Sequence, residues 1–233
     1  MMIELKNVVK QYGTTKENMM YAMDHIDLSI EEGELCVILG PSGSGKSTLL
    51  NMVGGIDTID EGQIFVDGVE LNKLSQKELT EYRREKIGFI FQFFNLIPDL
   101  TAEENIQAVS DITPSPLDID DVMKTLGIEK LHDRFPKELS GGQQQRIAIA
   151  RSIIKNPRLL LCDELTGALD SKSSKDVMLF IDKINREYKT TIVIITHNEA
   201  IKNVADRIVR IKDGKIISNE LNPERVSAGE IEL

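Results

Sequence analysis

Residues 40–48 read "GPSGSGKST" and fit the pattern G-x-x-x-x-G-K-[ST]. They follow an apolar run, "LCVIL" (35–39), which predicts a buried strand, and they open the helical pattern "GKSTLLNMVGG" (45–55). A glycine-rich turn between a strand and a helix is the context in which this pattern binds phosphate groups. The alternative is a glycine- and serine-rich turn with an incidental lysine, but such a turn needs no strand before it and no helix after it. We therefore expect an α/β fold with a phosphate site at this turn.

Each part of this turn has a chemical role in holding a nucleotide. The glycines let backbone N–H groups converge on an anion, and the helix dipole adds partial positive charge. Lys46 brings a full charge near the β- and γ-phosphates, and Ser47 offers a hydroxyl to Mg²⁺. The predicted phosphate-binding residues are Gly40, Pro41, Ser42, Gly43, Ser44, Gly45, Lys46, Ser47 and Thr48.

Two further apolar runs, "LLLC" (159–162) and "TIVII" (191–195), favour strands buried on both faces, as in a parallel sheet. Helical patterns separate the runs, which is typical of an α/β architecture. We expect the region from about residue 95 to 155 to be a mostly helical insertion. The last stretch, "NPERVSAGEIEL" (222–233), is polar and weakly patterned.

The N-terminal third shows a different periodicity. The segments "MIELKNVVKQY" (2–12) and "AMDHIDLSI" (22–30) alternate as half-buried strands do. The pairs Asp67-Gly68 and Asp213-Gly214 each lie between such segments and predict hairpin turns. An antiparallel β subdomain should therefore accompany the parallel core sheet.

Polar side chains follow two of the buried runs, where the carboxyl ends of parallel strands face a ligand crevice. Asp163 can hold Mg²⁺, and Glu164 can polarise an attacking water. His197, just after "TIVIIT", can hydrogen-bond the γ-phosphate or that water. The alternatives are a solvated acidic pair at a strand end and a structural or exposed histidine.

A second glycine motif, "LSGGQQQR", spans residues 139–146. Ser140 is a suitable N-cap, and Gly141 and Gly142 would expose N–H groups at the start of a helix whose apolar face begins at Ile147. This predicts a second anion-binding helix terminus. The alternative is a glycine-rich helix start without a ligand.

Composition narrows the function classes. The chain has 233 residues, of which 41% are hydrophobic and 28% charged, and a formal net charge of −10. This charge disfavours binding to nucleic acid and to anionic lipid. No apolar run reaches the roughly 18 residues of a membrane span, and the N-terminus lacks a signal-peptide core. We expect a cytoplasmic protein whose membrane association comes through a protein partner. Cys36 and Cys162 each lie inside an apolar run, which favours buried reduced thiols over a disulfide or a metal site.

The motifs "GPSGSGKST", "LSGGQQQR", "LLLCDE", "GALD" and "ITH", in this order, resemble the nucleotide-binding subunit of an ATP-binding cassette (ABC) transporter. The resemblance covers essentially the whole chain. It implies a P-loop NTPase fold with a mostly parallel core sheet, an N-terminal antiparallel β subdomain and an α-helical subdomain at roughly 95–155. Residues 1–233 would then form a single ATP-hydrolysing domain.

The resemblance adds roles that spacing does not give. It implies that Tyr12 stacks on adenine, and that Gln92 in "FIFQFFNL" senses the γ-phosphate and Mg²⁺ and links to a membrane permease. The alternatives are a strand-end aromatic for Tyr12 and a surface amide for Gln92. In the family, two subunits hold two ATP molecules head to tail between them. Each ATP site takes the signature segment of the opposite chain, here Ser140, Gly141, Gly142 and Gln143, with Asp170 of "GALD" at the interface.

One residue departs from the family pattern, and one segment indicates a branch. Leu165 stands where the family commonly carries proline, which would stiffen the loop after Glu164. The segment "FQFFNLIPDLTAEEN" (91–105) resembles the lipoprotein-release and macrolide or peptide-export branch. Its apolar residues could form a groove for a short permease helix or could pack into the core; these are Phe93, Phe94, Leu96 and Ile97.

Three functions are compatible with these observations. The first is an ATPase subunit that drives a membrane transporter. The second is an ABC ATPase of DNA repair, chromosome organisation or translation, although such proteins tend to carry coiled-coil insertions, duplicated cassettes or basic patches. The third is an ABC ATPase that moves a partner in the cell envelope without carrying cargo.

Overall fold

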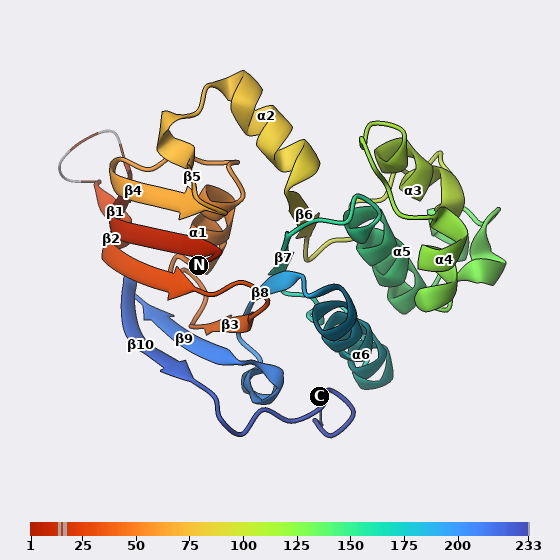
Figure 1. The fold of residues 1–233 in the computed structure, drawn as a ribbon. Helices are drawn as coiled ribbons and strands as arrows, with labels where there is room; N and C mark the ends of the chain where they lie inside the picture. The colour runs from red at the N-terminus through yellow and green to blue at the C-terminus, as the bar shows by residue number, and fades with distance from the viewer. Residues whose placement is uncertain (14, 16–17, 233) are drawn as a thin grey trace.

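The computed structural model describes residues 1–13, 15 and 18–232. It contains two sheets (Figure 1). The first is antiparallel, with strand order β2-β1-β4-β5. Its strands are β1 (Ile3–Tyr12), β2 (Met20–Ile30), β4 (Glu61–Val66) and β5 (Val69–Glu70). The expected antiparallel β region at the N-terminus is confirmed.

The second sheet has six strands in the order β10-β9-β3-β8-β7-β6. All neighbours pair in parallel except β10, which runs antiparallel to β9. The strands are β3 (Leu35–Leu39), β6 (Ile87–Ile90), β7 (Leu159–Asp163), β8 (Thr191–Thr196), β9 (Arg207–Lys212) and β10 (Lys215–Leu221). The three apolar runs form its centre, as predicted. Strands β9 and β10 form the hairpin predicted at Asp213-Gly214, and β6 is a parallel member that the sequence pattern did not reveal.

Strand β3 explains why these runs are apolar throughout. Leu35, Val37 and Leu39 enter one hydrophobic core, while Cys36 and Ile38 enter a second core on the other face. Alternate side chains of a strand point to opposite faces, so both faces of this sheet are covered. Both cysteines are buried and free, and burial raises the pKa of each thiol above its usual range.

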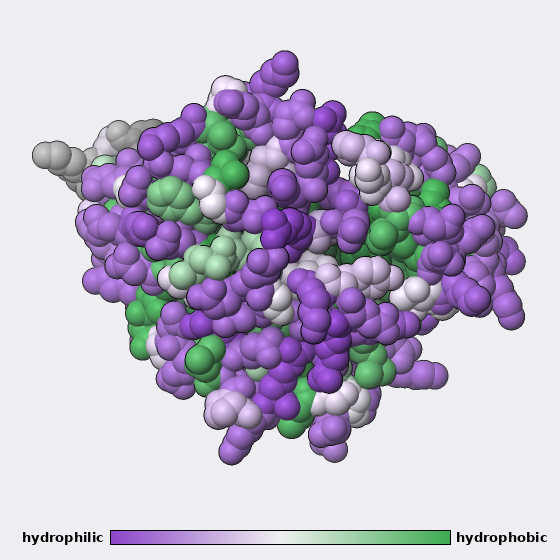
Figure 2. Space-filling view, in the orientation of Figure 1, coloured by the Kyte–Doolittle hydropathy of each residue, from purple (hydrophilic) through white to green (hydrophobic). Residues whose placement is uncertain are grey.

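The α-helices are α1 (Lys46–Val53), α2 (Gln76–Glu85), α3 (Ala102–Ser110), α4 (Ile119–Thr125), α5 (Gly141–Ile153) and α6 (Ser171–Tyr188). Short 3₁₀ helices cover Leu71–Lys73, Glu129–Leu131, Pro136–Glu138 and Glu199–Val204. Helices α3, α4 and α5 gather on the side of the molecule away from the four-stranded sheet (Figure 1). Among the described residues, no helix has both the length and the apolar character needed to cross a membrane. The face drawn in Figure 2 is largely hydrophilic.

The two hairpin turns and the C-terminal segment have clear local causes. Asp67 and Gly68 have φ values of +49° and +75°, and Asp213 and Gly214 have +50° and +75°, which suits tight hairpin turns. The C-terminal segment is more firmly packed than its polar sequence suggests. Ile231 is only 3% exposed, and the Arg225 guanidinium donates to two carboxylates, both at 2.6 Å, one on Asp182 of α6 and one on Asp206 before β9.

Candidate active site

Helix α1 starts differently from the other five α-helices in the described chain. Its N-cap, Gly45, has φ of +103° and provides no side-chain cap. A Cβ at Gly45 would lie 2.2 Å from the Ala22 carbonyl oxygen, so only glycine fits. The other five helices are each capped by a side-chain oxygen, from Ser75, Thr101, Asp118, Ser140 and Asp170 respectively. The first turn of α1 therefore has N–H groups available to an anion.

Lys46 is folded over the loop that precedes it. Its Nζ donates to the carbonyl oxygens of Gly40 (2.8 Å) and Pro41 (2.9 Å). The residue is buried, and burial lowers the pKa of its amine. The loop is also closed by the Ser44 N–H, which donates to the Pro41 carbonyl oxygen at 3.2 Å. The chain thus holds a cation at the centre of the loop with no carboxylate within ion-pair distance among the described residues.

Asp163 ends β7 beside Ser47 of α1. Burial and the neighbouring charge of Glu164 raise the pKa of the Asp163 carboxyl, while a hydrogen bond from the Ser47 hydroxyl and the charge of Lys46 oppose that shift. A hydroxyl and a carboxylate are oxygen ligands that suit Mg²⁺. No group of three or more His, Cys, Asp or Glu side chains in the described part of the chain could hold a metal alone. The donor set therefore fits a Mg²⁺ ion shared with phosphate oxygens.

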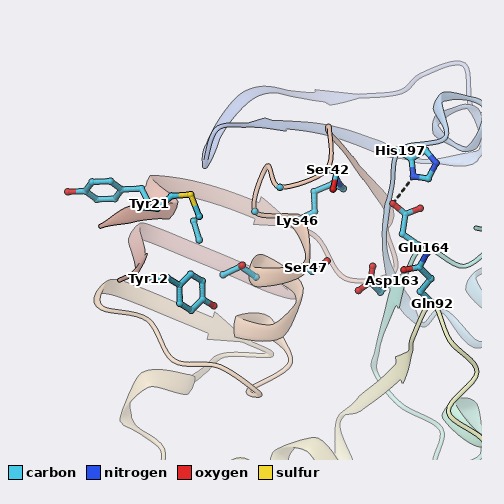
Figure 3. A pocket seen from close by; sticks show the side chains of 14 residues that line it. Tyr12, Tyr21, Ser42, Lys46, Ser47, Gln92, Asp163, Glu164 and His197 are labelled. Atoms are coloured by element: carbon cyan, nitrogen blue, oxygen red, sulfur yellow. Dashed lines mark hydrogen bonds and ion pairs between the residues drawn. The ribbon is translucent and has the colours of Figure 1, made fainter. Parts of the chain in front are cut away.

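Glu164 lies in a strained and well-held position after β7. Its φ is +47°, an uncommon value for a residue with a side chain. One carboxylate oxygen lies 2.9 Å from Nδ1 of His197, and the other accepts a hydrogen bond from the Thr196 hydroxyl at 3.1 Å. Figure 3 shows the His197 contact across the strand ends. Thr196 was not predicted, although it is the last residue of the β8 run that precedes His197.

The phosphate-binding loop, Asp163, Glu164 and His197 face one cavity of about 550 Å³ (Figure 3). Its lining includes the predicted Tyr12, Ser42, Gly43, Gly45, Lys46, Ser47, Thr48, Gln92, Asp163, Glu164 and His197. Met20, Tyr21 and Ala22 also line it and were missed. The pairing of Met20 with Tyr12 between β2 and β1 brings them there, and sequence spacing gives no sign of this register. Gly40, Pro41 and Ser44 belong to the same loop but do not line the cavity.

The segment Ser140–Gln143 lies outside this cavity. The Ser140 hydroxyl accepts from the Gln143 N–H at 3.3 Å, and the Gln143 side chain accepts from the Ser140 N–H at 2.9 Å, so α5 has the expected N-cap. Gly142 is a buried residue, although its N–H, in the first turn of α5, has no acceptor within the helix. A Cβ there would lie 2.7 Å from the Ser173 Oγ of α6, so any larger residue would have to displace the Ser173 side chain. Asp170 caps α6 by accepting from the Ser173 N–H at 2.9 Å.

Comparison with known proteins identifies the family. Residues 23–167 match the family model described as ABC transporter. The chain belongs to the ABC transporter family. It is a cassette of the ATP-binding, ATP-hydrolysing kind, with the mixed α/β fold expected from its motifs.

Relatives of this cassette agree with the branch indicated by its sequence. It is 39% identical to the lipoprotein-releasing system ATP-binding protein LolD 2 of Chlorobaculum tepidum, over 93% of this chain and 92% of that protein. It is 46% identical to an ABC transporter ATP-binding protein of Mycoplasma pneumoniae over 90% of its length, but spans only 63% of that relative. A solved ATP-binding cassette, dimeric in a post-hydrolysis state with ADP and Pi, superimposes with a TM-score of 0.86 at 41% identity, covering 94% of this chain and 98% of the other.

Two further residues lie near Glu164: Gln92, on the loop after β6, and Leu165, the next residue in its own turn. Gln92 follows β6 and is exposed at the cavity wall, where its amide nitrogen approaches Gly167. Leu165 is 2% exposed and belongs to the hydrophobic core. The Gly167 N–H donates to the Glu164 carbonyl oxygen at 3.0 Å, which closes a turn with Leu165 as its second residue. The leucine side chain therefore anchors a loop that proline would hold by backbone rigidity.

Proposed function

We propose that this cassette is the ATP-hydrolysing subunit of a membrane transporter and that it works as a head-to-tail homodimer. One observation carries the proposal: a single cavity contains the phosphate loop, Asp163, Glu164 and His197, but no residue of Ser140–Gln143. A site that needs the signature segment must therefore obtain it from another copy. The dimeric solved cassette with ADP and Pi supports this arrangement.

The residues of the cavity divide the chemical work. Lys46 and the open first turn of α1 bind and orient the phosphates. Glu164 is the general base that takes a proton from the attacking water, and His197 holds both that carboxylate and the γ-phosphate. Tyr12 stacks on the base, and Thr48, at the first turn of α1, completes the phosphate cradle. Ser140 and Gly142 of the second copy supply donors to the γ-phosphate from the opposite side.

Ser47 and Asp163 are the residues that would hold Mg²⁺, with Gln92 reaching the same ion. When bound, the ion neutralises charge on the phosphates. The raised pKa of the Asp163 carboxyl fits this role, because a nearby divalent cation would favour the ionised form of a group that burial alone disfavours.

The segment after Gln92 is the proposed contact with the permease. Phe93 and Ile97 are 72% and 46% exposed, whereas Leu96 packs against the core. The groove and the core-packing interpretations thus apply to different residues of one segment. A permease helix on Phe93 and Ile97 would hold the cassette at the cytoplasmic face of the membrane and leave Gln92 between the two partners.

Purification of the tagged cassette from detergent-solubilised membranes tests the transport role. Recovery of a polytopic membrane protein that raises the ATPase rate of the cassette supports the proposal. An envelope-remodelling ATPase would also recover a membrane partner, and transport assays in vesicles with the purified complex separate the two. Recovery of ribosomes or nucleic acid in place of a membrane protein would contradict both.

A further inference from the structure

A hydrogen-bonded network holds the proposed base-binding ring. The Tyr12 hydroxyl donates to the Asp57 carboxylate at 2.5 Å. The Lys10 amine donates to the other oxygen of the same carboxylate at 2.9 Å, and to the Thr58 carbonyl oxygen at 2.7 Å. Lys10 is 7% exposed, although lysine is rarely buried without a partner. Asp57 is therefore the residue that joins the two side chains.

The loop that carries Asp57 is fixed to the end of β1. The Asp60 carboxylate accepts from the Gln11 N–H at 2.6 Å, and the Asp60 N–H donates to the Val9 carbonyl oxygen at 2.9 Å. The loop is also tied to the phosphate-binding helix, because the Asp57 N–H donates to the Asn51 carbonyl oxygen of α1 at 3.2 Å. These contacts set the position of Asp57 relative to both β1 and α1.

The network also decides which face of the ring is free. The Lys10 Nζ lies 5.1 Å from the centroid of the Tyr12 ring, at cation–π distance. A ligand base cannot stack on the face that this amine covers. The ring lines the cavity and remains 43% exposed, which leaves the opposite face for stacking (Figure 3).

We infer that Asp57 is a positioning residue for nucleotide recognition, which locks the Tyr12 ring at a fixed place relative to the phosphate-binding helix. The inference rests on the proposed function, because it assumes that the cavity binds ATP. In this arrangement the Lys10 amine covers one face of the Tyr12 ring and leaves the other face for the base. Hydrogen bonds from Tyr12 and Lys10 lower the pKa of Asp57 despite its partial burial, so the carboxylate remains an acceptor at neutral pH.

A locked ring should improve binding without entering the chemical step. Holding a side chain in its bound position avoids the entropy loss of ordering it, which corresponds to about three- to tenfold in affinity. The carboxylate that acts on water, Glu164, makes its contacts to Thr196 and His197 and none to this network. The expected change is therefore in KM for ATP, with kcat unchanged.

Two variants remove the same contact from opposite ends. Asp57→Ala deletes the acceptor, and Tyr12→Phe deletes the hydroxyl while keeping the ring. Each should raise KM for ATP by about three- to tenfold, and the double variant should not exceed the larger single effect. Inhibition by inorganic tripolyphosphate, which has phosphates but no base, should be the same in all of them. Asp27→Ala is the control, since the Asp27 carboxylate accepts from the Asn7 N–H of β1, whereas the Tyr12 hydroxyl and the Lys10 amine both donate to Asp57.

Unchanged KM in both variants would overturn the inference, and so would an equal loss of tripolyphosphate binding, because Asp57 would then act on the phosphate half of the site. If Asp57→Ala fails to fold, Tyr12→Phe alone decides. Failure of the proposed function would look different: the unaltered cassette would recover no membrane partner and form no ATP-dependent dimer, whatever the KM values of the variants.

Discussion

The two glycine-rich helix starts of this molecule differ in what they face. Helix α1 begins at Gly45 with no side-chain cap, inside a cavity that also holds Asp163, Glu164 and His197. Helix α5 begins after Ser140 with a complete capping box of its own and packs on α6 of the same chain. In the proposed dimer, the first helix start belongs to the ATP site of its own chain, and the second would complete the site of the other copy. The difference would then explain why folding can be complete when the catalytic site is not.

The largest effect is expected at Glu164, which lies in the same cavity as the first helix start. Glu164→Gln removes the base but keeps the shape of the side chain, with one oxygen and one amide nitrogen in place of the two carboxylate oxygens that contact Thr196 and His197. The ATPase rate should fall by about 100- to 10,000-fold, while ATP still binds. Size-exclusion chromatography with ATP and Mg²⁺ should then show a dimer. A variant that stays monomeric would mean that the two halves do not meet without a permease, or do not meet at all.

Lys46→Ala tests whether α1 alone binds the nucleotide. The amine makes charge-assisted contacts, so ATP affinity should fall by about 10- to 100-fold, measured by titration of a fluorescent ATP analogue. The variant should show no ATP-dependent dimer. If nucleotide affinity were unchanged, the open helix start would not be the phosphate site, and the contrast between the two helix starts would lose its basis.

Ser140→Ala tests the second helix start, with Ser75→Ala as a matched control. Both serines accept from the N–H three residues on, at 3.3 Å for Ser140 and 3.4 Å for Ser75. Each variant should lose about 0.5–2 kcal/mol in the free energy of unfolding. Only Ser140→Ala should also lower the ATPase rate, by about 10- to 100-fold, since a hydrogen bond to a charged phosphate is worth about 1.5–3 kcal/mol. Equal ATPase rates in the two variants would limit Ser140 to a capping role.

Leu165→Pro should have the smallest effect. Leu165 is the second residue of a turn, where proline is accepted, but its buried side chain also packs in the core. The gain in rigidity and the loss of packing oppose each other, so the ATPase rate should change less than tenfold, about 1.4 kcal/mol in barrier height. A greater loss would show that the anchored leucine positions Glu164.

Much of the fold could be predicted from the sequence, because the apolar pattern of the central strands matches their burial on both faces of the sheet. The apolar runs Leu35–Leu39, Leu159–Cys162 and Ile192–Ile195 supply residues alternately to two cores. Strand β6 was missed because it is four residues long and contains Gly88. The C-terminal packing was missed because its main anchor is Arg225, whose three polar partners lie on segments distant in sequence.

The candidate site also contains residues that the sequence could predict and residues that it could not. Residues at strand ends and in the phosphate loop could be predicted, because topology brings the carboxyl ends of parallel strands together. Met20, Tyr21 and Ala22 depend on the register between β1 and β2, and the hold of Thr196 on Glu164 depends on side-chain direction. The burial of Gly142 depends on how α5 packs against Ser173. None of these three features leaves a periodic signal in the chain.

A structure of Glu164→Gln with ATP and Mg²⁺ tests the central claim most directly. The quantity to measure is the distance from the Gly142 backbone nitrogen to the nearest γ-phosphate oxygen, together with the identity of the chain whose Lys46 holds that phosphate. We predict a hydrogen-bond distance of about 3 Å to a nucleotide held by the other copy. A Gly142 nitrogen far from every triphosphate in the assembly, or next to one held by its own chain, would contradict the account.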